Sequence, residues 1–366
     1  MRQARKHPSG RGFQRLAMEK LEDRSLMAGN VTAVVTNGVL VVTGDTADNG
    51  ITIDYNQTTD AYSVIGTTPT GSTATTINGL DTSVPANAQI FNNVTKGIRV
   101  IANNGNDLLV FGAATSTSFV VDGFVDIQMG NGNDTVTIGR NGNAAGGAAP
   151  IANEFEVGTT MAIKLGSGND TLDITNASIA RDLTIHADVN NPLNTATDGN
   201  DTVRFPTTFT PSGGELTAFP VTVGKKTTVL LGGGADTFNG ANLRARGGMF
   251  VQDLGANLNF DLVDTVVGGE LKLQKTGGSA NDILIDNVQA GTLRISTGNA
   301  VDTIAVRDSI FERMYIESGG GVDRITIGNT RVRKLGLIDG GREKARLIQE
   351  GGNTLRGVVK IKTFTN

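Results

Sequence analysis

A glycine turn that leads into an acid and then a short apolar strand recurs along the chain, and this repeat limits the possible folds most. Two clear copies are GNGNDTVTIG at 130–139 and GSGNDTLDI at 166–174. Each marker acid is followed two positions later by an apolar residue, as expected of a strand with one buried face. The marker acids are Asp107, Asp134, Asp170, Asp201, Asp236, Asp282, Asp302 and Asp323.

A second strand precedes each turn, as in FVDIQMG at 124–130 and RMYIESG at 313–319. From Gly232 onward the turn glycines recur every 20 to 23 residues, and in two turns we expect Asn259 and Lys344 at the place of the acid. The earlier repeats are longer because they carry polar or glycine-rich inserts. These inserts lie at 140–150, 189–197 and 206–220.

A unit of about 21 residues cannot bury its own apolar face, so it must stack on its neighbours. Stacked units pair strand to strand in parallel, about 4.8 Å apart. We therefore expect an all-β chain in which residues 97–366 form a parallel β-helix of about ten coils of ~21 residues or more, right-handed by the general crossover preference. The composition agrees, since glycine is abundant (49 residues) and aromatic residues make up only 5%.

Residues 30–96 lack this repeat and show hairpin signals instead. Asn37–Gly38 stands between two valine-rich runs, which is the strongest short signal for a hairpin. The stretch ITIDYNQTTDAYSVIG at 51–66 predicts a second hairpin. We expect an antiparallel β cap at the N-terminal end, which would shield the first strand edge from other chains.

Residues 1–29 are basic and lack the apolar core of an ordinary secretory signal, so the residues alone predict a disordered tail. The segment LEDRSLMAG at 21–29 resembles the LEPR-XLL-type segment of planctomycete exported and surface proteins. Asp23 stands where proline is common in that segment, and Met27 where a second leucine is common. The resemblance implies an extracellular or cell-surface protein whose leader is disordered or is cleaved near Ala28. It implies no activity.

The repeated acids have two explanations that the residues leave open. Asp and Asn bond to nearby backbone and stack into side-chain ladders, so the acids can be turn residues only. The turn also resembles the RTX nonapeptide, Gly-Gly-x-Gly-x-Asp-x-apolar-x, which implies Ca²⁺ held by carboxylates and turn carbonyls. The candidate metal ligands are Asp107, Asp134, Asp170, Asp201 and Asp236.

The remaining features restrict the function classes. A net charge of −4 gives no reason to expect nucleic-acid binding. No apolar run reaches 18 residues, so we expect no membrane span. The chain has no Cys, which excludes disulfides and thiolate metal sites.

We expect a non-enzymatic, secreted or cell-surface β-solenoid of structural or adhesive type, with an extracellular matrix, polysaccharide or protein partner, or self-assembly. One alternative is a carbohydrate-active β-helix, such as a polysaccharide lyase or hydrolase. A hydrolase needs two carboxylates at a set separation, and no such pair can be singled out among acids that recur in every repeat. Sugar sites usually carry aromatic side chains, but Trp is absent and Tyr is rare. A second alternative is a protein-binding solenoid that uses the outer face of its strands.

Overall fold

The computed structural model describes residues 29–366 except for 70–71, 73, 83–86, 113–117, 140–154, 189–198, 207, 210–216, 219, 344, 356–357, 363 and 366. The proposed leader, apart from Gly29, and the inserts at 140–150 and 189–197 lie outside the described residues. The described part is all-β, as predicted. It contains no helix long and apolar enough to cross a membrane.

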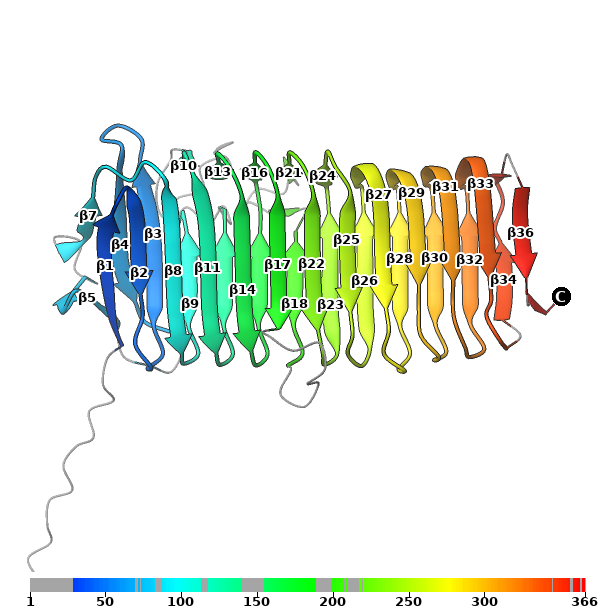
Figure 1. Cartoon of the computed structure of the whole chain (residues 1–366), viewed down its shortest axis with the longest axis horizontal. Helices are drawn as coiled ribbons and strands as arrows, with labels where there is room; N and C mark the ends of the chain where they lie inside the picture. The colour runs from blue at the N-terminus through cyan, green and yellow to red at the C-terminus, as the bar shows by residue number, and fades with distance from the viewer. Residues whose placement is uncertain are drawn as a thin grey trace, which may run out of the picture.

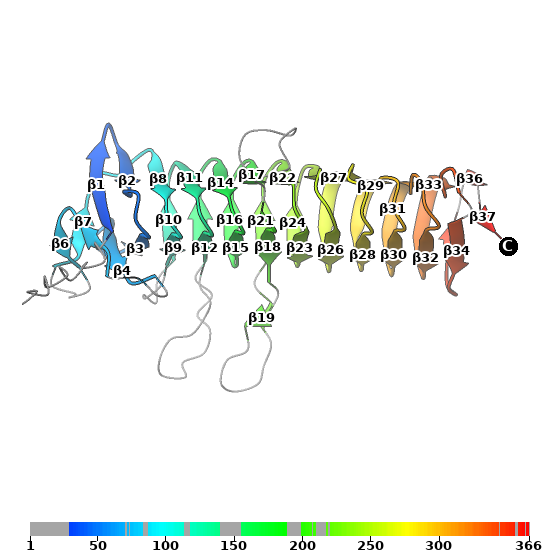
Figure 2. The ribbon, with the colours of Figure 1, turned by 90° about the horizontal axis from the view of Figure 1, so that it is seen from below.

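Two long sheets contain nearly all of the described strands, and they run side by side along the molecule (Figures 1 and 2). The narrow sheet has 14 strands. Its strands are β3 (Gly50–Asn56), β4 (Ala61–Thr67), β7 (Gln89–Phe91), β9 (Leu108–Phe111), β12 (Thr135–Ile138), β15 (Thr171–Ile174), β18 (Thr202–Phe205), β23 (Asp236–Ala241), β26 (Leu258–Val263), β28 (Asp282–Asp286), β30 (Thr303–Arg307), β32 (Arg324–Gly328), β34 (Ala345–Gln349) and β37 (Phe364–Thr365).

The wide sheet has 21 strands. Its strands are β1 (Asn30–Thr36), β2 (Val39–Thr43), β5 (Thr76–Ile77), β6 (Leu80–Asp81), β8 (Gly97–Asn104), β10 (Phe119–Val121), β11 (Phe124–Asn131), β13 (Phe155–Val157), β14 (Met161–Ser167), β16 (Ala177–Ile179), β17 (Leu183–Asp188), β21 (Val221–Val223), β22 (Thr227–Gly232), β24 (Leu243–Ala245), β25 (Met249–Asp253), β27 (Val266–Lys275), β29 (Gln289–Ser296), β31 (Ile310–Glu317), β33 (Arg331–Asp339), β35 (Thr354–Leu355) and β36 (Val358–Lys362).

The chain alternates between the two sheets, and we call one strand of the narrow sheet with the wide-sheet segments that follow it a pass. After β15, for example, the chain forms the short strand β16 and the longer strand β17. Strands of successive passes pair in parallel and in register, so Leu172 of β15 lies beside Val136 of β12 and Val203 of β18. The predicted parallel pairing of successive repeats is therefore confirmed.

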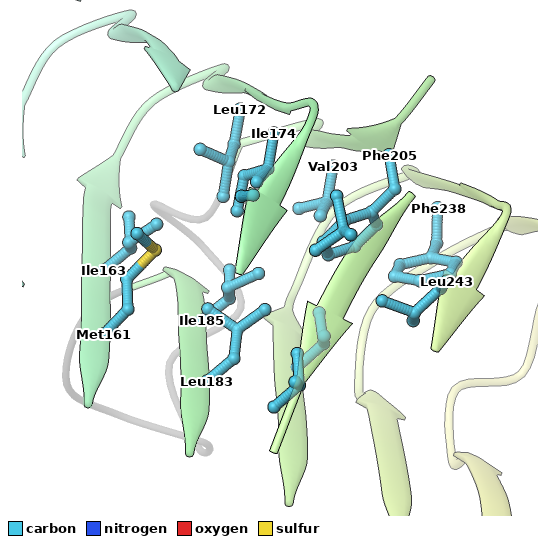
Figure 3. Packing of buried hydrophobic residues seen from close by; sticks show 14 of the residues in the cluster. Met161, Ile163, Leu172, Ile174, Leu183, Ile185, Val203, Phe205, Phe238 and Leu243 are labelled. Atoms are coloured by element: carbon cyan, nitrogen blue, oxygen red, sulfur yellow. The ribbon is translucent and has the colours of Figure 1, made fainter. Parts of the chain in front are cut away.

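The core lies between the two sheets because every second side chain of a strand points inward. Leu172 and Ile174 of β15 point toward Met161 and Ile163 of β14, and the next pass repeats this contact (Figure 3). Each large apolar side chain that is fully buried contributes roughly 1.5–3 kcal/mol. The buried residues form one cluster that extends along the stack of passes.

The antiparallel pairs gather at the N-terminal end, as predicted. β1 pairs with β2 through the Asn37–Gly38 turn, and both turn residues have the positive φ that a tight hairpin requires. β3 pairs with β4, β4 with β7, and β5 with β6. This segment joins the parallel stack directly, because β2 pairs with β8 and β3 with β9.

A further antiparallel pair, β19 (Thr208–Phe209) with β20 (Thr217–Ala218), lies in the insert at 206–220. In Figure 2, β19 stands apart from the two rows of strands.

The register corrects three predicted positions of the marker acid. Asp236 pairs with Leu258, and Asn259 pairs with Asp282, so Asn259 and Asp282 both lie one position beyond the column. The residues at the acid position are Leu258 and Asn281. The cause is an irregularity between β22 and β25, where Gly232 pairs with Asp253 instead of Gly255.

The third correction concerns the last turn. Arg324 pairs with Arg346, which places Ala345 beside Asp323. Lys344, the predicted position, lies outside the described residues.

Candidate functional site

The five predicted metal ligands occupy equivalent positions in successive passes, each just before or at the start of a narrow-sheet strand. All five are buried, with 1–2% of each residue exposed. The structure therefore brings together every acid of the predicted set in one column, which we call the aspartate column. Its members are Asp107, Asp134, Asp170, Asp201 and Asp236.

Each carboxylate of the column accepts a hydrogen bond from the backbone N–H of the preceding pass at its Oδ1 atom. The donor and acceptor pairs are Asn49 to Asp107 (2.7 Å), Asp107 to Asp134 (2.8 Å), Asp134 to Asp170 (2.7 Å), Asp170 to Asp201 (2.8 Å) and Asp201 to Asp236 (2.9 Å). A buried N–H without a partner costs about 1–3 kcal/mol, so each carboxylate stabilises the turn that precedes it.

The column is interrupted once and then continues. At the interruption Leu258 offers no side-chain acceptor, and the Asp236 N–H donates to the carbonyl of Asn257 instead (2.9 Å). The Leu258 N–H donates to Asn281 Oδ1 at 2.9 Å. The later pairs are Asn281 to Asp302 (3.1 Å) and Asp302 to Asp323 (2.8 Å).

A second ladder, made by the asparagines that precede the marker acids, was not predicted. Asn133 N–H donates to Asn106 Oδ1 (2.8 Å), and Asn169 N–H donates to Asn133 Oδ1 (2.7 Å). These bonds run in the opposite direction, because each asparagine accepts from the following pass. The Asn-Asp pair thus ties every turn to both of its neighbours. The recurrence of Asn directly before Asp was the available sequence signal.

The turn glycines are explained by how closely the backbones of successive turns approach. Gly132 and Gly168 have φ values of 139° and 122°, which L side chains rarely adopt. A Cβ on Gly132 would collide with the carbonyl of Gly105, and one on Gly168 with the carbonyl of Gly132. Stacking alone therefore accounts for the glycine two positions before the acid.

Burial changes the ionisation of the column. It raises the pKa of Asp107, Asp134 and Asp170 from 3.8 to about 7, although the backbone hydrogen bonds act in the opposite direction. Burial likewise raises the pKa of Asp236 to about 9. These carboxyls hold their protons at much higher pH than exposed ones do.

Neutral amides at the same positions show what a protonated carboxyl would do there. Asn281 Nδ2 donates to Asp302 Oδ1 at 2.7 Å, and Asn49 Nδ2 donates to Asp107 Oδ1 at 3.2 Å. A protonated carboxyl also offers one donor and an acceptor. The column thus accommodates neutral groups that accept from one neighbouring pass and donate to the other.

Ca²⁺ needs six to eight oxygen ligands, and this geometry supports the turn ladder better than a calcium site. Each Oδ1 is already held by an N–H, whose positive end points at the oxygen. Within the described residues, no group of three or more His, Cys, Asp or Glu side chains could hold a metal ion. Calcium binding by the aspartate column stays a prediction.

A second corner, between the narrow sheet and the short wide-sheet segments, was also missed by sequence reasoning. Its residues share a left-handed backbone, with φ between 45° and 54°. They are Asn176, Asn242, Asp264, Asn287, Asp308 and Asn329. Their side chains link neighbouring passes: Asn287 Nδ2 donates to Asp264 Oδ1 at 2.6 Å, and Asn329 donates to Asp308 in the same way.

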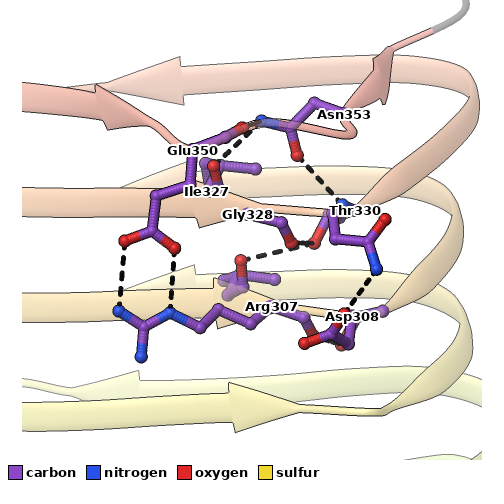
Figure 4. A network of polar contacts seen from close by, with 10 residues as sticks. Arg307, Asp308, Ile327, Gly328, Thr330, Glu350 and Asn353 are labelled. Atoms are coloured by element: carbon purple, nitrogen blue, oxygen red, sulfur yellow. Dashed lines mark hydrogen bonds and ion pairs between the residues drawn. The ribbon is translucent and has the colours of Figure 1, made fainter.

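The residue after this corner provides a further bond, as Figure 4 shows for Thr330. Its hydroxyl donates to the Gly328 carbonyl (2.9 Å), and its N–H donates to Asn353 Oδ1 (2.9 Å). Arg307 and Glu350 form a two-point ion pair nearby, at 3.2 and 3.3 Å. An Asn or Asp followed by Ser or Thr at a strand end was the signal for this corner.

A buried ion pair lies at the interruption of the aspartate column. Lys275 Nζ is 3.5 Å from Asp253 Oδ1, and both side chains are 0% exposed. Lys275 Nζ also donates to the Gly255 carbonyl (2.6 Å), and the Gly255 N–H donates to Asp253 Oδ1 (2.6 Å). The alternation of Leu271, Leu273 and Lys275 was the signal that Lys275 points inward.

The outer face of the wide sheet carries an open hollow of about 440 Å³. It is lined by Lys226, Gly248, Met249, Phe250, Glu270 and Lys272. Lys272 Nζ lies 5.2 Å from the centroid of the Phe250 ring, and Lys226 Nζ lies 5.9 Å from it. One aromatic ring thus holds two cations at the rim of the hollow.

The same face continues over the next two passes. Phe250 pairs with Lys272, Lys272 with Arg294, and Arg294 with Tyr315. The Arg294 guanidinium lies 4.5 Å from the centroid of the Tyr315 ring. We call Lys226, Phe250, Lys272, Arg294 and Tyr315 the cation–aromatic stripe.

Comparison with protein-family models, curated proteins and solved structures found no match.

Proposed function

We propose that the chain is a right-handed parallel β-solenoid that serves as a non-enzymatic structural or adhesive rod outside the cell or on its surface. The observation that carries the proposal is the in-register pairing of both sheets, pass after pass, from β8 and β9 to β33 and β34. Each pass rests on its neighbours, which is how a solenoid is stabilised. At about 4.8 Å per pass, the stack is long and thin.

The contacts between passes suit a rod that must keep its shape. The aspartate column, the opposed asparagine ladder and the second corner all join one pass to the next. Surface ion pairs between passes add little, about 0–1 kcal/mol each. Examples are Arg99 with Asp126 (2.9 Å) and Arg204 with Asp173 (2.6 Å). Rigidity therefore comes from the apolar core and the ladders.

The location can be tested by labelling cells with an antibody raised against residues 29–366. We expect labelling of intact cells or recovery of the chain from the medium, together with small-angle scattering from an elongated particle. Labelling only after lysis would contradict the export that the segment at 21–29 implies. A globular scattering profile would contradict the rod.

The carbohydrate-active alternative is tested separately. It predicts the release of new sugar ends from a polysaccharide incubated with the protein. We expect no release above that of a heat-denatured sample. A saturable release would replace the structural proposal.

A further inference from the structure

We propose that the cation–aromatic stripe binds a linear acidic polysaccharide, one that carries carboxylate or sulfate groups. The inference rests on the proposed extracellular function and adds a site and a ligand class to it. Its basis is the placement of cations from different passes around an open hollow.

The shape of the site suits an extended chain. The stripe crosses neighbouring strands β25, β27, β29 and β31, so its members are spaced by about 4.8 Å per strand. The hollow is open, and the absence of a side chain at Gly248 leaves backbone exposed at its floor. A polymer could lie across several passes without having to enter a closed pocket.

The charge of the site is opposite to that of the whole chain, whose net charge is −4. Within the described residues, Lys226 and Lys272 form no ion pair. Arg294 pairs with Glu270 at 3.2 Å, but both side chains are well exposed, so this pair is weak. Three cations against one carboxylate make an anionic ligand the complementary one.

The aromatic rings hold the cations in place. Lys226 and Lys272 both contact the Phe250 ring, and Arg294 contacts Tyr315. Ordering long side chains before a ligand arrives reduces the entropy lost on binding. Because Lys226 and Lys272 lie in passes on either side of Phe250, their spacing is about two strands, or ~10 Å. A polymer with a regularly repeated acidic group can meet both cations and Arg294 at once.

The test uses the purified full chain and four probes: polygalacturonate, dextran sulfate, uncharged dextran and double-stranded DNA. Binding is measured by titration calorimetry at low and at physiological salt. We expect binding to at least one of the two acidic polysaccharides, and that binding should be tighter than to uncharged dextran or to DNA. The two acidic probes separate a preference for carboxylate from one for sulfate.

Matched variants locate the site. The double variant K226Q/K272Q should weaken binding at least tenfold. The control R324Q/R346Q removes the same charge from exposed arginines on the narrow sheet and should leave binding unchanged. F250L keeps every charge but removes the ring, and should weaken binding several-fold with the same salt dependence. Circular dichroism checks that each variant is folded.

Three results would overturn the inference: no binding to either acidic polysaccharide, equal loss in both double variants, or tighter binding to DNA. None of them bears on the rod, which scattering and cell labelling test independently.

Discussion

The substitution Asp134→Asn tests whether the aspartate column is a ladder of neutral carboxyls. Asp134 is 1% exposed, so solvent does not screen its charge appreciably. Burial raises its pKa from 3.8 to about 7, and at a pH above 8 the folded protein must carry a charge that the unfolded chain accommodates more easily. That rise corresponds to ~4 kcal/mol of lost stability.

The sign follows from proton binding. Between pH 4 and 7 the folded state binds more protons at Asp134 than the unfolded state, so the unfolding free energy falls as pH rises through this window. The amide that D134N introduces cannot ionise, and its oxygen can accept the Asp107 N–H as Asn281 Oδ1 accepts the Leu258 N–H. We expect D134N to match the wild type within ~1 kcal/mol at pH 5 and to be more stable at pH 9 by up to ~4 kcal/mol.

Urea unfolding at pH 5, 7 and 9, followed by circular dichroism, measures the difference. The control is Asp282→Asn, an exposed position one residue beyond the column, which should show no such pH-dependent gain. A wild type that becomes more stable from pH 5 to pH 9, or a D134N protein that is less stable than the wild type at pH 9, would refute the ladder of neutral carboxyls.

Three further predictions test the turns and the interior. The hydrogen-bonded ladder predicts that millimolar Ca²⁺ raises the thermal midpoint no more than Mg²⁺ does; a rise specific to Ca²⁺ and reversed by EDTA would establish the calcium site instead. Gly168→Ala should lower the unfolding free energy by roughly 1–3 kcal/mol, because its φ is 122° and its Cβ would meet the backbone of the preceding turn. Gly278→Ala, where a Cβ meets nothing within 4 Å, is its control in the same urea titration and should change little. Lys275→Met should cost about 3–5 kcal/mol, since it leaves Asp253 buried without its cation. The double change K275M/D253L should recover much of that loss, and a double variant as unstable as K275M alone would argue against the ion pair as the cause.

The architecture was largely readable from the sequence. The alternation around Val136 and Leu172 places every second side chain inward, and the repeat of about 21 residues requires units that stack in parallel. Asn37–Gly38 specified its hairpin, because few residues adopt the two positive φ values of that turn. These features are local or periodic, so one chain without relatives displays them.

The candidate sites were less accessible. Asp282 was assigned to the column because it follows a turn glycine, whereas the register shift between β22 and β25 moves that position to Asn281. The ladder partners of Asp134 and Asn133 lie in neighbouring passes, 27 and 36 residues away, so no local pattern shows which way each side chain points.

The sequence by itself determined the strands, the turns and the parallel stacking, since these depend on side-chain periodicity and on glycine's backbone freedom. Only the tertiary structure decided that the acids are buried and that Lys275 neutralises an interior carboxylate. It also decided that Lys226, Phe250 and Lys272 meet on one face. Burial, pKa and the meeting of residues from different passes depend on which passes stack and in what register, and that is a property of the assembled sheets.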